Sequence, residues 1–161
     1  MKIVNSKTMK TFEQLINEAL ENVEEIFPWD LAEAIEEKPG LMLLDVREPY
    51  EYDAMHIRNA LNVPRGILET ACEFDYEETV PELVNARERE IIVICRSGKR
   101  SVLVAQVMQQ IGYRNVKSLK TGMRGWSDDD QEMVDGEGKL VDEESAIEYF
   151  TPKLRPEQMS K

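Results

Sequence analysis

The chain has 161 residues, 42% of them hydrophobic and 32% charged, which suits one folded domain and excludes a largely disordered chain. Its 32 acidic and 20 basic residues give a formal net charge of −12, which disfavours nucleic acids and anionic membranes as partners. No apolar run approaches the roughly 18 residues of a membrane span, no signal-peptide pattern opens the chain, and Cys72 and Cys95 are expected as free thiols, so a cytoplasmic protein is predicted.

An amphipathic helix is expected near the N-terminus, over residues 11–23. Apolar side chains recur there at helical spacing, and glutamates lie largely on the opposite face. The helix either packs on the main domain, which is the simpler interpretation, or contacts a protein partner. Exposure of Phe12, Leu15 and Leu20 would indicate a partner.

The middle of the chain alternates between helix and strand patterns. Strands are expected at residues 41–46, 60–64, 91–94 and 116–119, and helices after Pro28 and at residues 67–74, 81–87 and 102–111. This alternation predicts an α/β domain whose central, largely parallel sheet has helices on both faces. A last short helix is expected at residues 142–150, followed by a mobile polar tail.

The most informative segment is residues 95–101, here called the Cys95 loop. It follows the strongest strand signal and leads into a helix, the position where parallel sheets carry their sites. A short strand-to-helix turn points backbone N–H groups into one concavity, next to the partial positive charge of the helix N-terminus. Arg96, Lys99 and Arg100 add full positive charges. Cys95 is therefore expected as a nucleophilic thiolate, in a cradle that could also hold a persulfide anion.

Three segments together resemble the signatures of the rhodanese-domain sulfurtransferase family. The Cys95 loop is similar to that family's active-site loop, residues 45–64 resemble its first signature, and residues 121–126 resemble its closing signature. The three occur in the family's order, and the resemblance covers residues 23–126. Met55 departs from the glycine that usually precedes the signature histidine, and Arg58 and Asn59 replace a frequent Pro-Gly pair.

The resemblance implies a rhodanese domain, which we assign to residues 23–133. It does not explain the two flanking segments, an amphipathic helical extension at residues 1–22 and a partly mobile extension at residues 134–161. It implies that Cys95 accepts a sulfane sulfur from thiosulfate or a similar donor and passes it to a thiol or cyanide acceptor. The anion would be bound by the rest of the loop, namely Arg96, Ser97, Gly98, Lys99, Arg100 and Ser101. Asp45, Arg47 and His56 are expected to support the site. No metal and no organic cofactor are implied.

Other interpretations of the same residues were weighed. Phosphatases with a related cradle place their arginine one position later, where this chain has Ser101, and a histidine before the cysteine, where it has Ile94. A phosphate-binding Walker loop is rejected because it needs glycine at Val93. Cys72 is interpreted as a packing residue, with resolution of a Cys95 persulfide as the alternative. A domain that carries sulfur or regulates one protein partner, without turnover, remains the second functional hypothesis.

Overall fold

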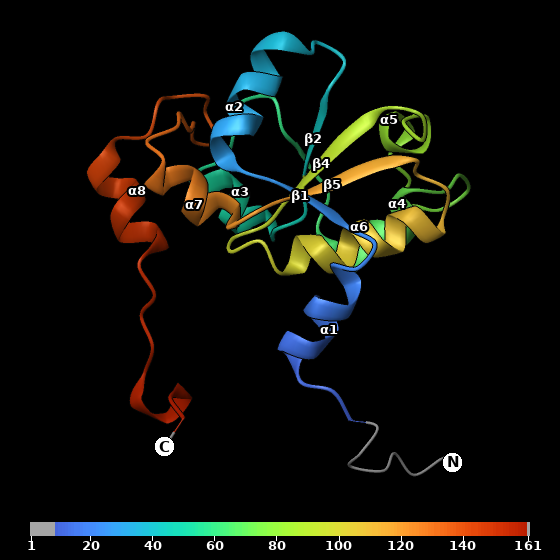
Figure 1. Ribbon diagram of the computed structural model, residues 1–161. Coiled ribbons are helices and arrows are strands. Elements are labelled where there is room, and N and C mark those ends of the chain that lie inside the picture. Colours follow the sequence, from blue (N-terminus) through green and yellow to red (C-terminus); the bar gives the residue numbers. More distant parts are fainter. Residues whose placement is uncertain (1–8, 161) are drawn as a thin grey trace.

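A five-stranded sheet lies at the centre of the molecule in the computed structural model, which describes residues 9–160 (Figure 1). Every pair of neighbouring strands is parallel, in the order β1-β5-β4-β2-β3. The strands are Glu24–Ile26 (β1), Met42–Asp45 (β2), Leu61–Asn62 (β3), Glu90–Ile94 (β4) and Asn115–Leu119 (β5). The predicted α/β fold with a largely parallel sheet is confirmed.

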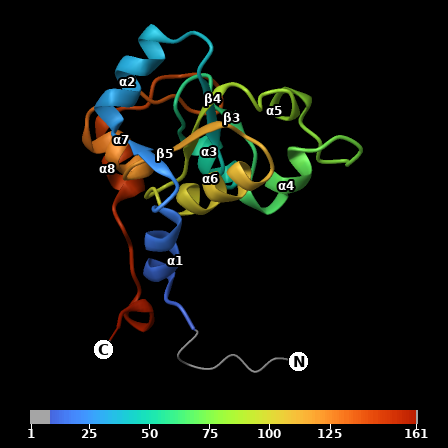
Figure 2. The same ribbon diagram turned by 45° about the vertical axis from the view of Figure 1, so that its right-hand side comes forward.

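Helices cover both faces of the sheet, as predicted. They are Phe12–Ala19 (α1), Pro28–Glu37 (α2), Pro49–Ala54 (α3), Leu68–Ala71 (α4), Pro81–Val84 (α5), Arg100–Gln110 (α6), Gly122–Asp128 (α7) and Glu143–Phe150 (α8), with short 3₁₀ turns at Arg65–Ile67 and Pro156–Gln158. Figure 2 shows α4 and α6 on one side of the sheet and α2, α7 and α8 on the other. The sheet is thus a buried middle layer.

The alternation of side chains along β4 divides the core into two clusters. Ile91 and Val93 belong to the cluster under α1, α4, α5 and α6, whereas Ile92 and Ile94 belong to the cluster under α2, α7 and α8. Successive side chains of a strand point to opposite faces, so a continuous apolar run is what a sheet covered on both faces requires. All four residues are fully buried.

Strand β1 was not predicted. The helix expected over residues 11–23 ends at Ala19, and the chain turns into Glu24–Ile26, which pairs with β5 at the edge of the sheet. Two of its three residues are glutamates and none is buried, so no apolar alternation in the sequence predicts a strand there. Its extended shape comes from backbone pairing with β5, which is a tertiary contact.

Other boundaries also differ from the expectations. The helices predicted at residues 67–74 and 81–87 are single turns, α4 and α5, while α3 and α7 were not predicted. Helix α3 lies inside the first signature segment, and α7 begins inside the closing signature segment and extends two residues beyond it. Helix α3 begins at Pro49 with a capping box between Glu48 and Glu51. Helix α8 begins one residue after its N-cap Asp142, close to its predicted start.

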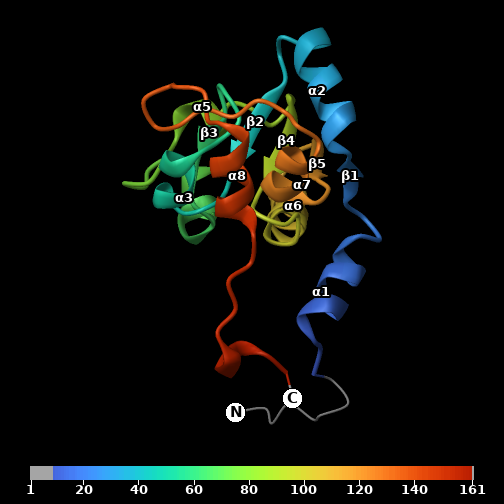
Figure 3. The same ribbon diagram turned by 90° about the vertical axis from the view of Figure 1, so that its left-hand side faces the viewer.

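Both flanking helices pack on the central domain. Ile16 and Ala19 of α1 are buried in one core cluster, and Ala146 and Phe150 of α8 are buried in the other. Figure 3 shows α1 and the segment after α8 extending from the same side of the molecule. The division at residues 22 and 133 stays a prediction. Within residues 9–160, no helix is long and apolar enough to cross a membrane.

Candidate active site

Cys95 lies directly after β4, at the carboxyl end of the sheet. It continues the alternation of Ile91 and Val93, so its side chain faces α6, and the residue is fully buried. The start of α7 fixes the backbone here, because Met123 N–H donates to the Cys95 carbonyl at 2.8 Å and Arg124 N–H donates to the Arg96 carbonyl at 2.9 Å. The closing signature segment therefore holds the Cys95 loop in place.

Several donors converge on the sulfur atom of Cys95. The N–H groups of Gly98 and Ser101 donate to Sγ at 3.2 and 3.3 Å, and the thiol donates to Ser101 Oγ at 3.3 Å. Ser101 Oγ also lies 2.7 Å from Ser118 Oγ, which comes from β5. In the thiolate form, the Ser101 hydroxyl is placed to donate to the sulfur in turn. Fixed donors around one sulfur stabilise negative charge on it.

Two glycines make this tight turn possible. Gly98 has φ of 84°, and a Cβ on it would lie 2.7 Å from the backbone nitrogen of Thr121. Gly122 has φ of 60°, and a Cβ on it would collide with the Cys95 carbonyl. A side chain at either position would separate the loop from the start of α7.

The three cationic side chains of the loop are held by three different elements. Arg100 forms a bidentate pair with Glu51 of α3, at 3.1 and 3.2 Å. Lys99 Nζ lies 2.5 Å from Glu13 Oε1 of α1. Arg96 donates to the Tyr149 carbonyl of α8 at 3.4 Å, and its guanidinium lies 5.9 Å from the centre of the Phe150 ring. Ser97, the residue after Arg96, is exposed.

The pair of Glu51 and Arg100 stays ionised over a wide pH range. Burial alone would raise the pKa of Glu51, but hydrogen bonds from Arg100 and from the Glu48 N–H, together with the nearby positive charges, lower it overall. The family resemblance implies that Arg100 helps to bind an anionic donor. In this conformation it is instead engaged by Glu51, and its role in binding a donor stays a prediction.

Asp45 and Arg47 form a fully buried ion pair at the end of β2, with Arg47 Nη2 2.7 Å from Asp45 Oδ2. Arg47 also donates to the carbonyls of Glu51 and Met55. Asn62 Nδ2 donates to the carbonyls of Asp45 and Arg47, at 3.0 Å each. These contacts tie β2, β3 and α3 together, so the pair reaches the Cys95 loop through Glu51.

His56 makes contacts that hold the fold. Its Nδ1 is 2.7 Å from the Tyr52 carbonyl, its ring stacks on the Tyr52 ring at 3.6 Å between centroids, and its backbone pairs with Val134. The two departures from the signature are accommodated here. Met55 has extended backbone with φ of −168°, and Asn59 adopts φ of 69°, a conformation that asparagine tolerates better than most residues.

Sequence reasoning missed Glu51, Ser118, Glu13 and Tyr149 as parts of this site. Glu51 lies within the first signature, whereas Ser118 lies in a strand that also contains Asn115 and Lys117, so its polarity did not mark it. Nothing local marked Glu13 or Tyr149, because their contacts depend on how α1 and α8 pack. Cys72 is a buried free thiol whose pKa is raised by burial, in keeping with a packing role.

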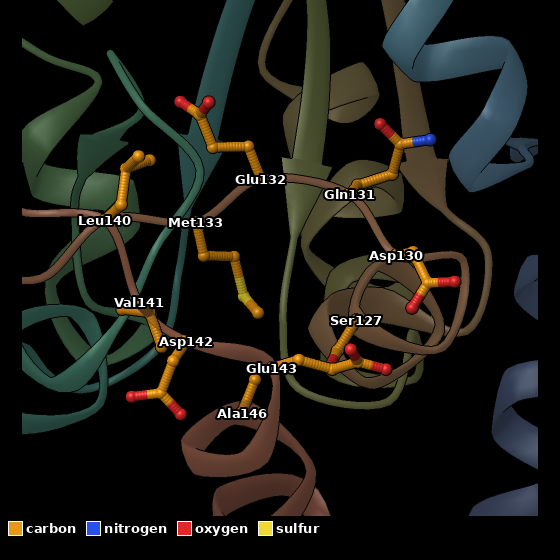
Figure 4. Close-up of a pocket in the computed structure, with 10 residues that line it drawn as sticks. All are labelled: Ser127, Asp130, Gln131, Glu132, Met133, Leu140, Val141, Asp142, Glu143 and Ala146. Carbon is orange, nitrogen blue, oxygen red and sulfur yellow. The ribbon is translucent and has the colours of Figure 1, made fainter.

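A surface hollow of about 300 Å³ lies elsewhere, between α7 and α8 (Figure 4). Met133, Val141 and Ala146 contribute apolar side chains to it, and the carboxylates of Asp130 and Asp142 lie at its edge. No residue of the Cys95 loop lines it. Among the described residues, no group of three or more His, Cys, Asp or Glu side chains is arranged to hold a metal ion.

The fold and the site define a class of protein: a parallel α/β domain that holds a buried cysteine among backbone N–H groups at the carboxyl end of its central strand. The family profile of the rhodanese-like domain matches residues 28–129, and the chain belongs to this family. The resemblance seen in the three signature segments is thereby confirmed.

Two curated relatives carry names that concern sulfur. The chain is 34% identical over 93 residues to the putative sulfur carrier protein YrkF of Bacillus subtilis, covering 58% of this chain and 45% of that protein. It is 32% identical over 90 residues to a putative mitochondrial thiosulfate sulfurtransferase of Schizosaccharomyces pombe, covering 54% of this chain and 63% of that protein. The chain thus spans only part of each relative.

Solved structures agree on the fold. A rhodanese-related protein of Thermoplasma volcanium is 27% identical with a TM-score of 0.56, covering 69% of this chain and 97% of that one. A protein of Rhodopseudomonas palustris, described as of unknown function and a possible tyrosine phosphatase, has a TM-score of 0.70 at 20% identity, covering 81% of this chain and 97% of that one. The second likeness shows the fold alone.

Proposed function

We propose that this protein is a sulfurtransferase that moves a sulfane sulfur from thiosulfate or a similar donor to a thiol or cyanide acceptor through a persulfide on Cys95. The observation that carries the proposal is the convergence of the Gly98 N–H, the Ser101 N–H and Ser101 Oγ on one sulfur atom. The two free thiols suit the reducing cytoplasm, where we place this activity.

The reaction proceeds in two displacement steps. The Cys95 thiolate attacks the outer sulfur of thiosulfate, so that the new S–S bond forms as the bond to the sulfite sulfur breaks, and sulfite leaves with the electron pair. The acceptor, cyanide or a thiolate, then attacks the outer sulfur of the persulfide. Thiocyanate or a new persulfide leaves, and the Cys95 thiolate returns. No external oxidant or reductant is consumed.

The chain's own residues supply charge stabilisation and shape. Negative charge resides on sulfur in the resting thiolate and in the persulfide, and the donors around Sγ are fixed before the reaction begins. The dipole of α6 points its positive end at the same place. Cys95 is fully buried, so a donor reaches the sulfur only after a local rearrangement around it.

A second candidate function is that of a persulfide carrier or regulatory domain that serves one protein partner. Phe12 and Leu15 on α1 are 49% and 42% exposed, while Leu20 packs against the core. Two of the three side chains named as indicators of a partner surface are therefore exposed, next to the contact of α1 with Lys99. A relative named as a sulfur carrier supports the same possibility.

The proposal is tested by thiosulfate:cyanide sulfurtransferase activity, with intact mass recorded after treatment with thiosulfate. Wild type is expected to form thiocyanate and to gain one sulfur atom, and Cys95→Ala is expected to do neither. Cys72→Ala serves as the matched control and keeps both properties. A wild type that gains sulfur without turnover would favour the carrier, and one that does neither would refute transfer from thiosulfate.

A further inference from the structure

Two helices outside the family-matched residues 28–129 reach the Cys95 loop. Helix α1 supplies Glu13 to Lys99, and helix α8 supplies the Tyr149 carbonyl and the Phe150 ring to Arg96. In Figure 1, α8 lies to the left of the loop that precedes α6 and α1 lies below it. The family fold therefore does not by itself determine what surrounds the loop in this chain.

Carboxylates neutralise most of the positive charge of the loop. Arg96, Lys99 and Arg100 are its three cationic side chains, and Glu13 and Glu51 pair with two of them. Arg96 is held by an uncharged carbonyl. Together with the Cys95 thiolate, the three cations and the two paired carboxylates carry no net charge, so a small anionic donor meets no net electrostatic attraction at the loop.

Glu13 is held beside Lys99 by the packing of its helix. Ile16 and Ala19 anchor α1 in the core, and Thr11 and Gln14 form a capping box that fixes its first turn. The Lys99 and Glu13 side chains are 44% and 64% exposed, whereas the Glu51 side chain is only 8% exposed. Replacing Glu13 therefore creates no cavity in the core, so a variant at this position tests the effect of its charge without a large change in stability.

We propose that Glu13 is a positioning residue for Lys99 that sets donor specificity: it holds Lys99 away from an incoming anion and so disfavours small dianionic donors such as thiosulfate relative to less charged ones. The inference rests on the proposed function for the identity of the donor. The claim that Glu13 lowers the positive charge near Cys95 does not rest on the proposed function, because the effect of that charge on Cys95 can be measured without turnover.

The first test compares alkylation of Cys95 by iodoacetate, a monoanion, and by uncharged iodoacetamide, with the labelled peptide identified by mass. Glu13→Gln makes the net charge at the loop more positive by one, so the ratio of the iodoacetate rate to the iodoacetamide rate is expected to rise about twofold. Glu18→Gln is the matched control. It removes one carboxylate from the same helix, but Glu18 pairs with Lys10, away from the loop, and the ratio stays at the wild-type value.

The second test is turnover at saturating acceptor. The electrostatic interaction free energy of a dianion with the loop changes by twice as much as that of a monoanion, so kcat/KM for thiosulfate is expected to rise about fourfold in Glu13→Gln. The change is expected in KM and not in kcat. The gain shrinks as NaCl is raised, because salt screens exposed charges.

The outcomes separate this inference from the proposed function. The role of Glu13 would be overturned if the ratio of the two alkylation rates in Glu13→Gln stayed at the wild-type value, whether or not both rates rose equally. It would also be overturned if neither reagent reached Cys95. An equal rise would show that Glu13 only restrains loop opening. A raised ratio in a protein that never turns over thiosulfate would uphold the electrostatic role and contradict turnover with thiosulfate as the donor.

Discussion

At the residue scale, the cradle around Cys95 combines one contiguous segment with single residues from elsewhere. Gly98 and Ser101 belong to the same short loop as the cysteine, so their proximity to Sγ was predictable from their positions in the chain. Ser118 reaches the cradle only because β5 lies beside β4 in the sheet. Local sequence thus predicted the donors, and strand order supplied the residue that orients the Ser101 hydroxyl.

Gly98→Ala tests whether the cradle depends on its backbone. Alanine at φ of 84° is strained, and its Cβ would press on the backbone of Thr121, so we expect a loss of about 1–3 kcal/mol in the free energy of unfolding. Urea denaturation measures that loss, and intact mass after thiosulfate treatment should show less sulfur on Cys95. Gly66→Ala is the control, since a Cβ there meets nothing within 4 Å. Equal stability of the two variants would contradict the strain at Gly98.

At the element scale, predictions succeeded where an element buries one face, as a helix does, or both faces, as a central strand does. The long helix α6 and the buried strands β2 and β4 carry clear apolar patterns, and each was placed within a few residues. Strand β1 has no such pattern because its form comes from pairing with β5. Helix α3 is only six residues long and buries little, so its caps, and not its periodicity, define it.

Helix α8 is predicted to be an integral part of the folded unit. Phe150 is 2% exposed in the core cluster that contains Trp126, so Phe150→Ala is expected to cost about 3–5 kcal/mol of stability. Ile147, one turn earlier, is 54% exposed, and Ile147→Ala should change stability by less than about 0.5 kcal/mol. Urea denaturation of both variants checks this. If Phe150→Ala unfolds like wild type, α8 is a detachable extension.

At the scale of the whole molecule, ion pairs join distant segments to the site. Glu51 connects α3 to the start of α6 through Arg100, and its backbone carbonyl accepts from Arg47 of the buried pair. Because the folded state lowers the pKa of Glu51 below its ordinary value of 4.5, this carboxylate contributes stability that is fully present above about pH 4.5. The contribution is lost as pH falls through the lowered pKa.

Glu51→Gln is therefore expected to be less stable than wild type at pH 7, by about 1–3 kcal/mol. The difference should narrow as the pH falls below about 4.5, because wild-type Glu51 then becomes protonated too. Midpoints of urea denaturation at pH 7, 5 and 4 measure it. Glu88→Gln is the control, since Glu88 pairs with Arg114 on the surface, and both side chains are about three-quarters exposed. A difference that does not vary with pH would contradict the ion-pair role.

The sequence by itself determined the α/β class, the positions of the buried strands along the chain and the cysteine loop, because buried strands and a strand-to-helix turn leave their pattern in adjacent residues. Only the tertiary structure decided which side chains hold the cations of that loop. Glu13, Glu51 and Tyr149 lie far from Cys95 along the chain, and nothing local to them specifies a partner. Their contacts arise from the packing of α1, α3 and α8 around the sheet, which minimises exposed apolar surface over the whole chain at once.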